Sequence, residues 1–297
     1  MATPAASTLF DADWLATLKS RAHQAPLRDR IALFAAGQQV GTVVHGLLDG
    51  FLNESSLWVT QNVRSKLLKQ EWMENGSPLV SWHLQGAATE SLNQIALALR
   101  DAPPGHPAHG YVAKYWRGEQ LGVYGASGDL LGSVERGAVR PLGIATRAVH
   151  LVGQTPAGHL WVQQRALDKT NDPGLWDTLM GGMISVEDDL HTALARETGE
   201  EAGLAMAQLR GVALRGRVNL QRPADNTGVG YVVEDINWFS CTVPQGLVPV
   251  NQDGEVAQFQ LLERAELVER LQRDEFTLEA SLILVAALSQ SVEAITP

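Results

Sequence analysis

Apolar and polar residues follow several different patterns in the first half of the chain. Apolar residues at helical spacing predict a short amphipathic helix in residues 10–26, ending at a proline. Residues 30–52 are rich in β-formers around a Gly-Gln-Gln turn, which predicts two extended runs. Residues 91–104 are typical of a helix that Ser91 caps and two prolines stop. Glycines at each likely reversal in residues 114–144 predict small hairpins.

The second half of the chain predicts a more regular succession of strands and helices. Residues 146–166 alternate as a hairpin turned by Thr-Pro-Ala-Gly. Residues 189–202 place apolar residues on one side of a helix and acidic residues elsewhere, and Gly203 supplies a C-terminal stop. Further strands are predicted at 211–221, 228–243 and 257–262, and further helices at 263–272 and 277–290.

Length and composition indicate a globular protein of two domains. The chain has 297 residues, and the segment 137–143 marks the predicted break. We expect an α+β accessory domain at 1–140 and a second domain at 141–297. No apolar run reaches the roughly 18 to 20 residues that span a bilayer, and the start lacks a basic segment followed by an apolar one, so we expect a cytoplasmic protein without a membrane partner. The single cysteine, Cys241, excludes an internal disulfide and agrees with a reducing compartment.

The net charge of -10 is concentrated in the second predicted domain. Residues 1–140 hold 12 basic and 12 acidic side chains, whereas residues 141–297 hold 11 basic and 21 acidic ones. A surplus of carboxylates argues against a nucleic-acid partner and suits a region that collects divalent cations. Many acidic domains are merely soluble, so the charge alone does not establish a metal site.

A dense acidic group lies near the end of the predicted helix 189–202. Residues three and four apart on a helix share a face, so Glu197, Glu200 and Glu201 project together from about one turn. Their repulsion costs roughly a few tenths of a kcal/mol per pair, which a bound divalent cation would cancel. The backbone carbonyl of Gly182 can add a further oxygen ligand. This set predicts a Mg²⁺ or Mn²⁺ site, and a solvated glutamate-rich face is the alternative.

The segment from Gly182 to Leu204 resembles the Nudix box. That box has a glycine, a glutamate and the run Arg-Glu-aliphatic-any-Glu-Glu-any-Gly-aliphatic at fixed spacing. Seven of the nine fixed positions match, and Asp188 and Thr198 depart from the pattern. In the family the first glutamate helps to orient the arginine, so the shorter Asp188 is expected to hold Arg196 less firmly and to weaken activity. The nine positions are Gly182, Asp188, Arg196, Glu197, Thr198, Glu200, Glu201, Gly203 and Leu204.

The resemblance implies an α/β Nudix fold over about residues 143–290, with a mixed sheet between helices. It also implies metal-dependent attack on a diphosphate linkage. Glu200 is either a third metal ligand or the base that activates water. Glu255, on a later loop, is the other candidate base, and a loop carboxylate without a function is its alternative. The implied metal ligands are Gly182, Glu197, Glu200 and Glu201, and the implied catalytic residues are Arg196, Glu200, Glu201 and Glu255.

Residues before the box narrow the substrate. Arg165, Lys169, Trp176 and Asp177 resemble elements of a Nudix branch related to thiamine pyrophosphokinase, whose members carry an additional N-terminal domain. That branch implies removal of phosphate from thiamine diphosphate, or from its oxidised analogues, to give the monophosphate. Arg165 and Lys169 would bind phosphate oxygens while Trp176 or Trp238 faces a planar heterocycle. Core packing of the tryptophans and a surface location of the two cations are the alternatives. The N-terminal domain would cover one side of the pocket or form a homodimer.

Three other functions stay open at this point. An isomerase similar to isopentenyl-diphosphate isomerase would share the fold, but that family uses a catalytic cysteine and a Gly-His where this chain has Gly181-Gly182, and Cys241 lies well after the box. A Nudix protein that only senses a ligand usually lacks box glutamates, and all three are present here. A nucleotide-sugar or dinucleotide diphosphatase would carry the same box and differ only in substrate.

Overall fold

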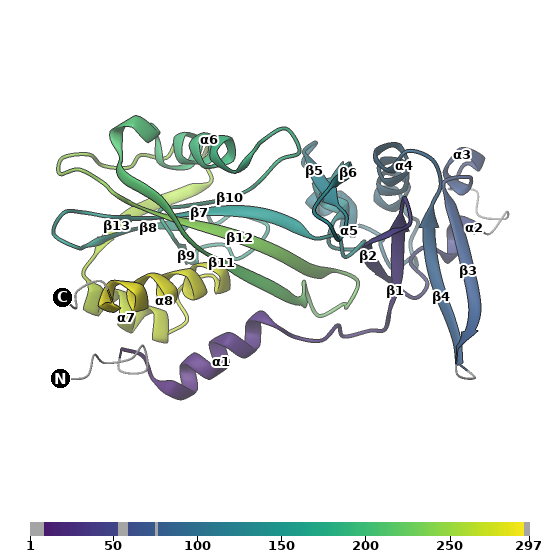
Figure 1. Ribbon diagram of the computed structural model, residues 1–297, viewed down its shortest axis with the longest axis horizontal. Helices are drawn as coiled ribbons and strands as arrows, with labels where there is room; N and C mark the ends of the chain where they lie inside the picture. Colours follow the sequence, from purple (N-terminus) through teal and green to yellow (C-terminus); the bar gives the residue numbers. More distant parts are fainter. Residues whose placement is uncertain (1–8, 53–58, 75–76, 294–297) are drawn as a thin grey trace.

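A computed structural model describes residues 9–52, 59–74 and 77–293, and Figure 1 shows two sheets with a short hairpin between them. The N-terminal part contains β1 (Arg30–Ala35), β2 (Gln38–Val44), α2 (Asp49–Leu52), α3 (Gln61–Arg64), β3 (Leu67–Glu74), β4 (Ser77–Leu84), α4 (Ala88–Arg100) and α5 (Tyr111–Tyr115). Its strands form a sheet in the order β2-β1-β4-β3. Strand β1 pairs antiparallel with β2 and parallel with β4, so the predicted extended runs in residues 30–52 are confirmed for both strands.

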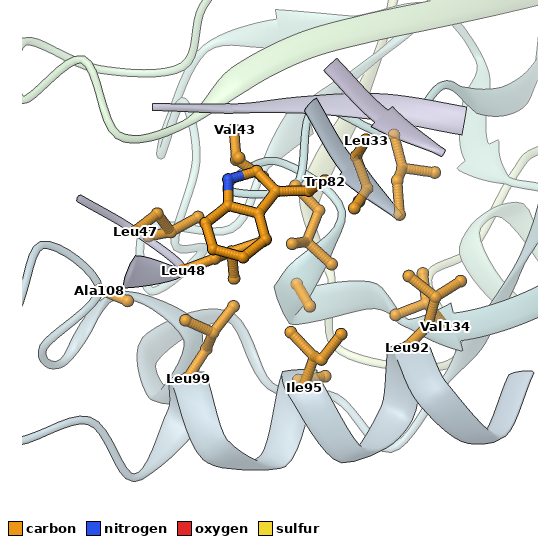
Figure 2. Packing of buried hydrophobic residues seen from close by; sticks show 14 of the residues in the cluster. Leu33, Val43, Leu47, Leu48, Trp82, Leu92, Ile95, Leu99, Ala108 and Val134 are labelled. Carbon is orange, nitrogen blue, oxygen red and sulfur yellow. The ribbon is translucent and has the colours of Figure 1, made fainter. Parts of the chain in front are cut away.

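The core of this part lies between its sheet and α4. Figure 2 shows the Trp82 ring from β4 among leucines of the strands and loops, with Leu92, Ile95 and Leu99 of α4 on the opposite side. These three α4 residues recur at helical spacing and are fully buried, and Trp82 is 1% exposed. The apolar stripe of this helix is therefore the face that packs on the sheet.

The predicted start of α4 is wrong by several residues. The helix begins at Ala88, its N-cap residue is Ala87, and no side chain caps it. Ser91 lies inside the helix, is buried, and donates its hydroxyl to the carbonyl oxygen of Gln85 at 2.6 Å. Gly86 at φ +79° lets the chain turn into the helix earlier than the serine indicated.

A hairpin connects the N-terminal sheet with the rest of the chain. It consists of β5 (Gln120–Tyr124) and β6 (Leu130–Glu135), followed by a 3-10 turn at Arg136–Ala138. The prediction of hairpins in residues 114–144 is confirmed for this one pair. The backbone N–H of Val186 donates to the carbonyl oxygen of Gln120 at 2.8 Å, so the hairpin also contacts the segment that leads into the box helix.

The C-terminal part is a seven-stranded sheet between helices. Five strands follow the order β11-β12-β7-β8-β13, while β10 pairs with β7 and β9 pairs with β8. Its elements are β7 (Thr146–Gln154), β8 (Leu160–Arg165), β9 (Trp176–Asp177), β10 (Met180–Met183), α6 (Leu190–Ala202), β11 (Arg210–Pro223), β12 (Tyr231–Thr242), β13 (Val256–Leu262), α7 (Arg264–Gln272) and α8 (Leu278–Glu293). Each strand and helix predicted beyond residue 146 is present in this set.

Helices cover both faces of this sheet. Figure 1 shows α6 on one face and α7 and α8 on the other, and a separate apolar core fills each layer. The α/β fold prediction with an α+β N-terminal part is confirmed. Helix α1 (Ala12–Ala22), predicted from its apolar spacing, packs against α8 and β11, and Leu18 enters the core beneath them. The division at residue 140 stays a prediction, and α1 contacts the part on the far side of it.

In the part of the chain that the structure describes, no helix is long and apolar enough to cross a membrane.

Candidate active site

The box helix α6 is shaped by residues at its own ends. The Asp189 carboxylate accepts hydrogen bonds from the backbone N–H groups of His191 at 3.0 Å and Thr192 at 2.7 Å, which satisfies donors that the first turn leaves free. At the other end Gly203 takes a left-handed conformation at φ +63° and closes the helix, as predicted. Antiparallel pairing of β10 with β7 then brings the glycines of β10 against α6.

Arg196 joins the acidic residues of the box. Its Nε donates to Asp188 Oδ2 at 2.9 Å, and its guanidinium also donates to Glu197 Oε1 and Glu200 Oε2, each at 3.0 Å. Asp188 is therefore long enough to hold Arg196, and the loose contact expected of the shorter side chain is not found. Thr198, the other departure, is fully buried, and its hydroxyl donates to the carbonyl oxygen of Leu194 at 2.6 Å.

Two glutamates of the box, the buried Glu201 and the half-buried Glu197, lie where the charged form of a carboxylate is disfavoured. Glu201 is 3% exposed and accepts hydrogen bonds from the Gly181 N–H at 3.0 Å and Gln163 Nε2 at 2.9 Å. Burial raises the pKa of Glu201 to about 8, although these hydrogen bonds favour its charged form. Burial likewise raises the pKa of Glu197 to about 7 against the opposing effect of Arg196. The pair therefore favours a further positive charge nearby.

Gly182 provides the space that Glu197 occupies. A Cβ atom at position 182 would lie 2.1 Å from Cδ of Glu197, so any other residue would displace the carboxylate. The buried Glu201, the half-buried Glu197, the half-exposed Glu200 and Gly182 line one cavity, and their carboxylate and carbonyl oxygens are of the type that suits a hard divalent cation. Among the described residues no three acidic, histidine or cysteine side chains converge as a metal centre, and two of the box carboxylates accept hydrogen bonds from Arg196.

These groups face a cavity of about 510 Å³. The cavity gathers most residues singled out from the sequence, although they come from separate elements. Lining it among them are Arg165, Lys169, Gly182, Arg196, Glu197, Glu200, Glu201 and Glu255.

Lysine and arginine side chains of the cavity already have polar partners. Lys169 forms an ion pair with Glu255, two residues that lie 86 positions apart in the sequence. Burial disfavours the charged form of Glu255, but the hydrogen bond and charge of Lys169 outweigh it and the pKa of Glu255 lies below its ordinary value. Arg165 donates to the carbonyl oxygen of Asn171 and lies 3.5 Å from Asp177 Oδ2.

Trp176 does not belong to this cavity, which corrects the prediction that it faces the substrate. It is 7% exposed, packs in the core beneath α8, and lies under the Arg270 guanidinium at 4.3 Å from the ring centroid. Trp238 is 2% exposed in the same core. Both rings serve packing because β9 and β12 direct them toward the helix layer opposite α6.

Several cavity residues were missed from the sequence. Arg117, Glu119 and Arg136 come from the segments that flank the hairpin strands β5 and β6, and Arg136 pairs with Glu119 at 2.7 Å. They adjoin glycines in the sequences Arg-Gly-Glu and Glu-Arg-Gly. This local pattern predicts exposed turns, but it does not predict which other segment the side chains contact. Asp168 and Asp253 complete the acidic lining on the loops before β9 and β13.

Comparison with known proteins agrees with this geometry. The model of the NUDIX domain matches residues 144–282. An uncharacterized Nudix hydrolase of Pseudomonas aeruginosa is 39% identical over 80 residues, which is 27% of this chain and 47% of that protein, so the match spans about half of the relative's length. An isopentenyl-diphosphate Delta-isomerase of Streptomyces avermitilis is 30% identical over 163 residues, covering 54% of this chain and 79% of that protein.

A crystal structure of a Deinococcus radiodurans protein is 19% identical, with a TM-score of 0.45, and covers 56% of this chain and 97% of that one. Together with the box on α6, the match to the domain model and the similarity to the Pseudomonas and Streptomyces proteins identify the family. The chain belongs to the family of NUDIX-domain proteins and is a homologue of Nudix hydrolases.

Proposed function

We propose that the protein hydrolyses a diphosphate linkage with the help of a divalent metal ion. The observation that carries this proposal is the mixed lining of one cavity: the box carboxylates line it together with the cations Arg165 and Lys169. A diphosphate carries negative charge that cations bind directly and that carboxylates bind only through a metal ion. A cavity lined by both carboxylates and cations suits a diphosphate that is bound to a metal ion.

The residues of the box have distinct tasks in this proposal. Glu197 and Glu201, with the Gly182 carbonyl, would hold Mg²⁺ or Mn²⁺, and Glu200 would either add a third carboxylate ligand or accept the proton of the attacking water. Such an ion neutralises diphosphate charge and acidifies the attacking water. Arg196 positions the carboxylates of Glu197 and Glu200 through its two hydrogen bonds. Lys169 and Arg165 would bind the phosphate oxygens in the same cavity.

Glu200 is the proton acceptor that the geometry favours. Its side chain is 49% exposed at the cavity, so water reaches it, whereas Glu201 is enclosed. Glu255 is paired with Lys169 and has a pKa below its ordinary value, which makes it the weaker base in the free protein. Glu255 keeps a role in holding Lys169.

Thiamine diphosphate and its oxidised analogues are the substrates we propose, with the monophosphate as product. Arg165, Lys169 and an N-terminal part that reaches the cavity support this choice. The Trp-Asp element of the same branch supports it only indirectly, because Asp177 is buried beside Arg165 and His150. A nucleotide-sugar or dinucleotide diphosphatase is the alternative within the same chemistry. A cytoplasmic location and a homodimer also stay predictions.

Isomerisation of isopentenyl diphosphate is the second candidate, because of the 30% identity to the Streptomyces isomerase. The structure offers no accessible thiol for it in the residues that it describes. Cys241 is 2% exposed in the core under α6, and burial raises its pKa to about 12. A thiol so placed cannot exchange a proton with a ligand in the cavity.

A substrate panel with magnesium tests the proposal. It contains thiamine diphosphate, an oxidised analogue, ADP-ribose, NADH, coenzyme A, nucleoside triphosphates and isopentenyl diphosphate. We expect phosphate release from the thiamine compounds and a loss of more than about a hundredfold in the Glu201→Gln variant. Glu187→Gln is the matched control, since Glu187 is an exposed acid of the box loop outside the cavity. Absence of turnover for every compound would favour a ligand sensor instead.

A further inference from the structure

The cavity has a second compartment that the box does not explain. A smaller cavity of about 40 Å³ adjoins it, and both are lined by Arg117, Arg136, Asn171 and Met183. Tyr115 and Arg140 line only the smaller one. A space of this size holds about one water molecule, so a larger group that contacts these residues has to lie mainly in the larger cavity. All its arginines and its aromatic ring come from residues before the NUDIX match.

Two arginines of this region form no ion pair with any residue that the structure describes. In the described ranges, neither Arg117 nor Arg140 has a carboxylate oxygen within 4 Å, whereas Arg136 is paired with Glu119. Arg117 donates to Thr170 Oγ1 at 2.8 Å and to backbone carbonyls, and Arg140 donates to Asn171 Oδ1 at 3.1 Å. Neutral oxygens accept the hydrogen bonds of both guanidinium groups, and the charge of Arg140 also opposes the rise in pKa that burial causes at Asp172 and Glu234. A ligand with acceptor atoms would complete them.

The Arg117 loop is held in place before any ligand binds. The Glu135 side chain is 1% exposed and accepts hydrogen bonds from the backbone N–H groups of Arg117 at 2.7 Å and Gly118 at 3.3 Å. The same carboxylate accepts a third bond from the Gly137 N–H at 3.4 Å. The buried Glu135 carboxylate therefore fixes both the segment before β5 and the segment after β6. Such preorganisation lowers the entropy lost on binding.

The Tyr115 ring lies beside Arg140, and Lys114 Nζ lies 5.1 Å from the centroid of the same ring. The Arg140 guanidinium lies 5.7 Å from the centroid of the Tyr115 ring, and Tyr111 packs on the same ring at 5.2 Å. Since Trp176 and Trp238 are in the core, Tyr115 is the aromatic ring that the residues lining either cavity provide, within the part that the structure describes. Arginine planes and a tyrosine ring together suit a planar group that carries hydrogen-bond acceptors.

We propose that Arg117, Arg140 and Tyr115 form a subsite for the organic group attached to the diphosphate, and that this group is planar and rich in acceptors. The proposal rests on the function above, in that a diphosphate occupies the larger cavity. It assigns to the N-terminal part the choice of substrate and leaves the diphosphate itself to the box and to Arg165 and Lys169.

Binding of organic and inorganic diphosphates by the full-length protein separates these tasks. We would measure Kd by calorimetry for thiamine diphosphate, ADP-ribose and inorganic pyrophosphate with magnesium, together with KM wherever turnover occurs. Arg117→Met and Arg140→Met should each weaken the bound organic diphosphate about tenfold, the loss typical of a charged hydrogen bond, and change pyrophosphate less than about twofold. Arg117→Lys should recover part of the loss for Arg117, because the charge remains and the planar fork is lost.

Arg273→Met is the control, since Arg273 is an exposed arginine of the α7 end that lines neither cavity. Melting temperatures identify a variant that fails to fold, and the Lys variant then provides the test. Equal weakening of pyrophosphate and organic diphosphates would overturn the subsite, as would unchanged binding or no binding of any organic diphosphate. Failure of the proposed hydrolysis is a different result, binding without turnover, and leaves the Kd comparison in force.

Discussion

Replacing Gly182 with alanine tests whether the Glu197 carboxylate must lie against β10. An alanine Cβ would lie 2.1 Å from Cδ of Glu197, whereas ordinary contacts begin near 3.4 Å. The carboxylate therefore has to withdraw by more than about 1 Å, and a misplacement of that size at a catalytic group costs roughly a hundredfold in rate. Gly182 lies in an extended strand without a positive φ, so alanine fits the backbone and the fold should persist.

The assay compares the hydrolysis rate, the magnesium concentration at half-maximal rate and the melting temperature of this variant with the wild type. Gly199→Ala is the matched control, because Gly199 lies in the same helix as Glu197 and a Cβ there meets nothing within 4 Å. It should keep its rate and gain about 0.5–1 kcal/mol of stability from helix propensity. A Gly182→Ala enzyme with wild-type rate and magnesium dependence would refute the assigned position of Glu197.

Three further predictions concern the acidic residues of the candidate site. Burial raises the pKa of Glu197 to about 7 and of Glu201 to about 8, above the unfolded value of 4.5. Their protonated forms therefore stabilise the metal-free fold at low pH, and that stability is lost as the pH rises from 4.5 through 8. Melting curves at about pH 5.5 and pH 8 measure this loss, which magnesium should reverse mainly at the higher pH; a melting temperature independent of pH contradicts the shifts. Glu200→Gln should lower kcat by about a hundredfold or more and Glu255→Gln by less than about tenfold, and the reverse order in single-turnover rates would assign the base to Glu255. Asp188→Glu introduces the residue that the family has at this position, but it should change kcat/KM by less than about threefold, because Asp188 already binds Arg196. A larger gain in kcat/KM would show that Asp188 does hold Arg196 less firmly than glutamate.

The box helix could be predicted because its causes are local. Residues three and four apart share a helix face wherever the helix lies, so the grouping of Glu197, Glu200 and Glu201 needed no knowledge of the fold. Asp189 and Gly203 act on the backbone of the same helix, and its start and end follow from them. The same applies to the strands and helices of the C-terminal part, whose periodic apolar residues correspond to observed elements. Ser91 was misplaced because a cap depends on where the chain enters the helix, which Gly86 controls.

The cavity residues outside the box come from segments that lie far apart in the sequence. Lys169 and Glu255 meet across 86 positions, and Arg117 reaches the cavity only because the β5–β6 hairpin docks beside the segment before α6. An arginine next to a glycine has the same local pattern whether it faces solvent or a ligand. The sequence could not predict the burial of the Trp176 ring either. A residue of β9 can face either helix layer, and only the packing of α8 and Arg270 over the ring determines which one. Side-chain spacing within a helix is determined by bond geometry over a few residues, whereas the partners across a cavity are selected by the packing of whole layers.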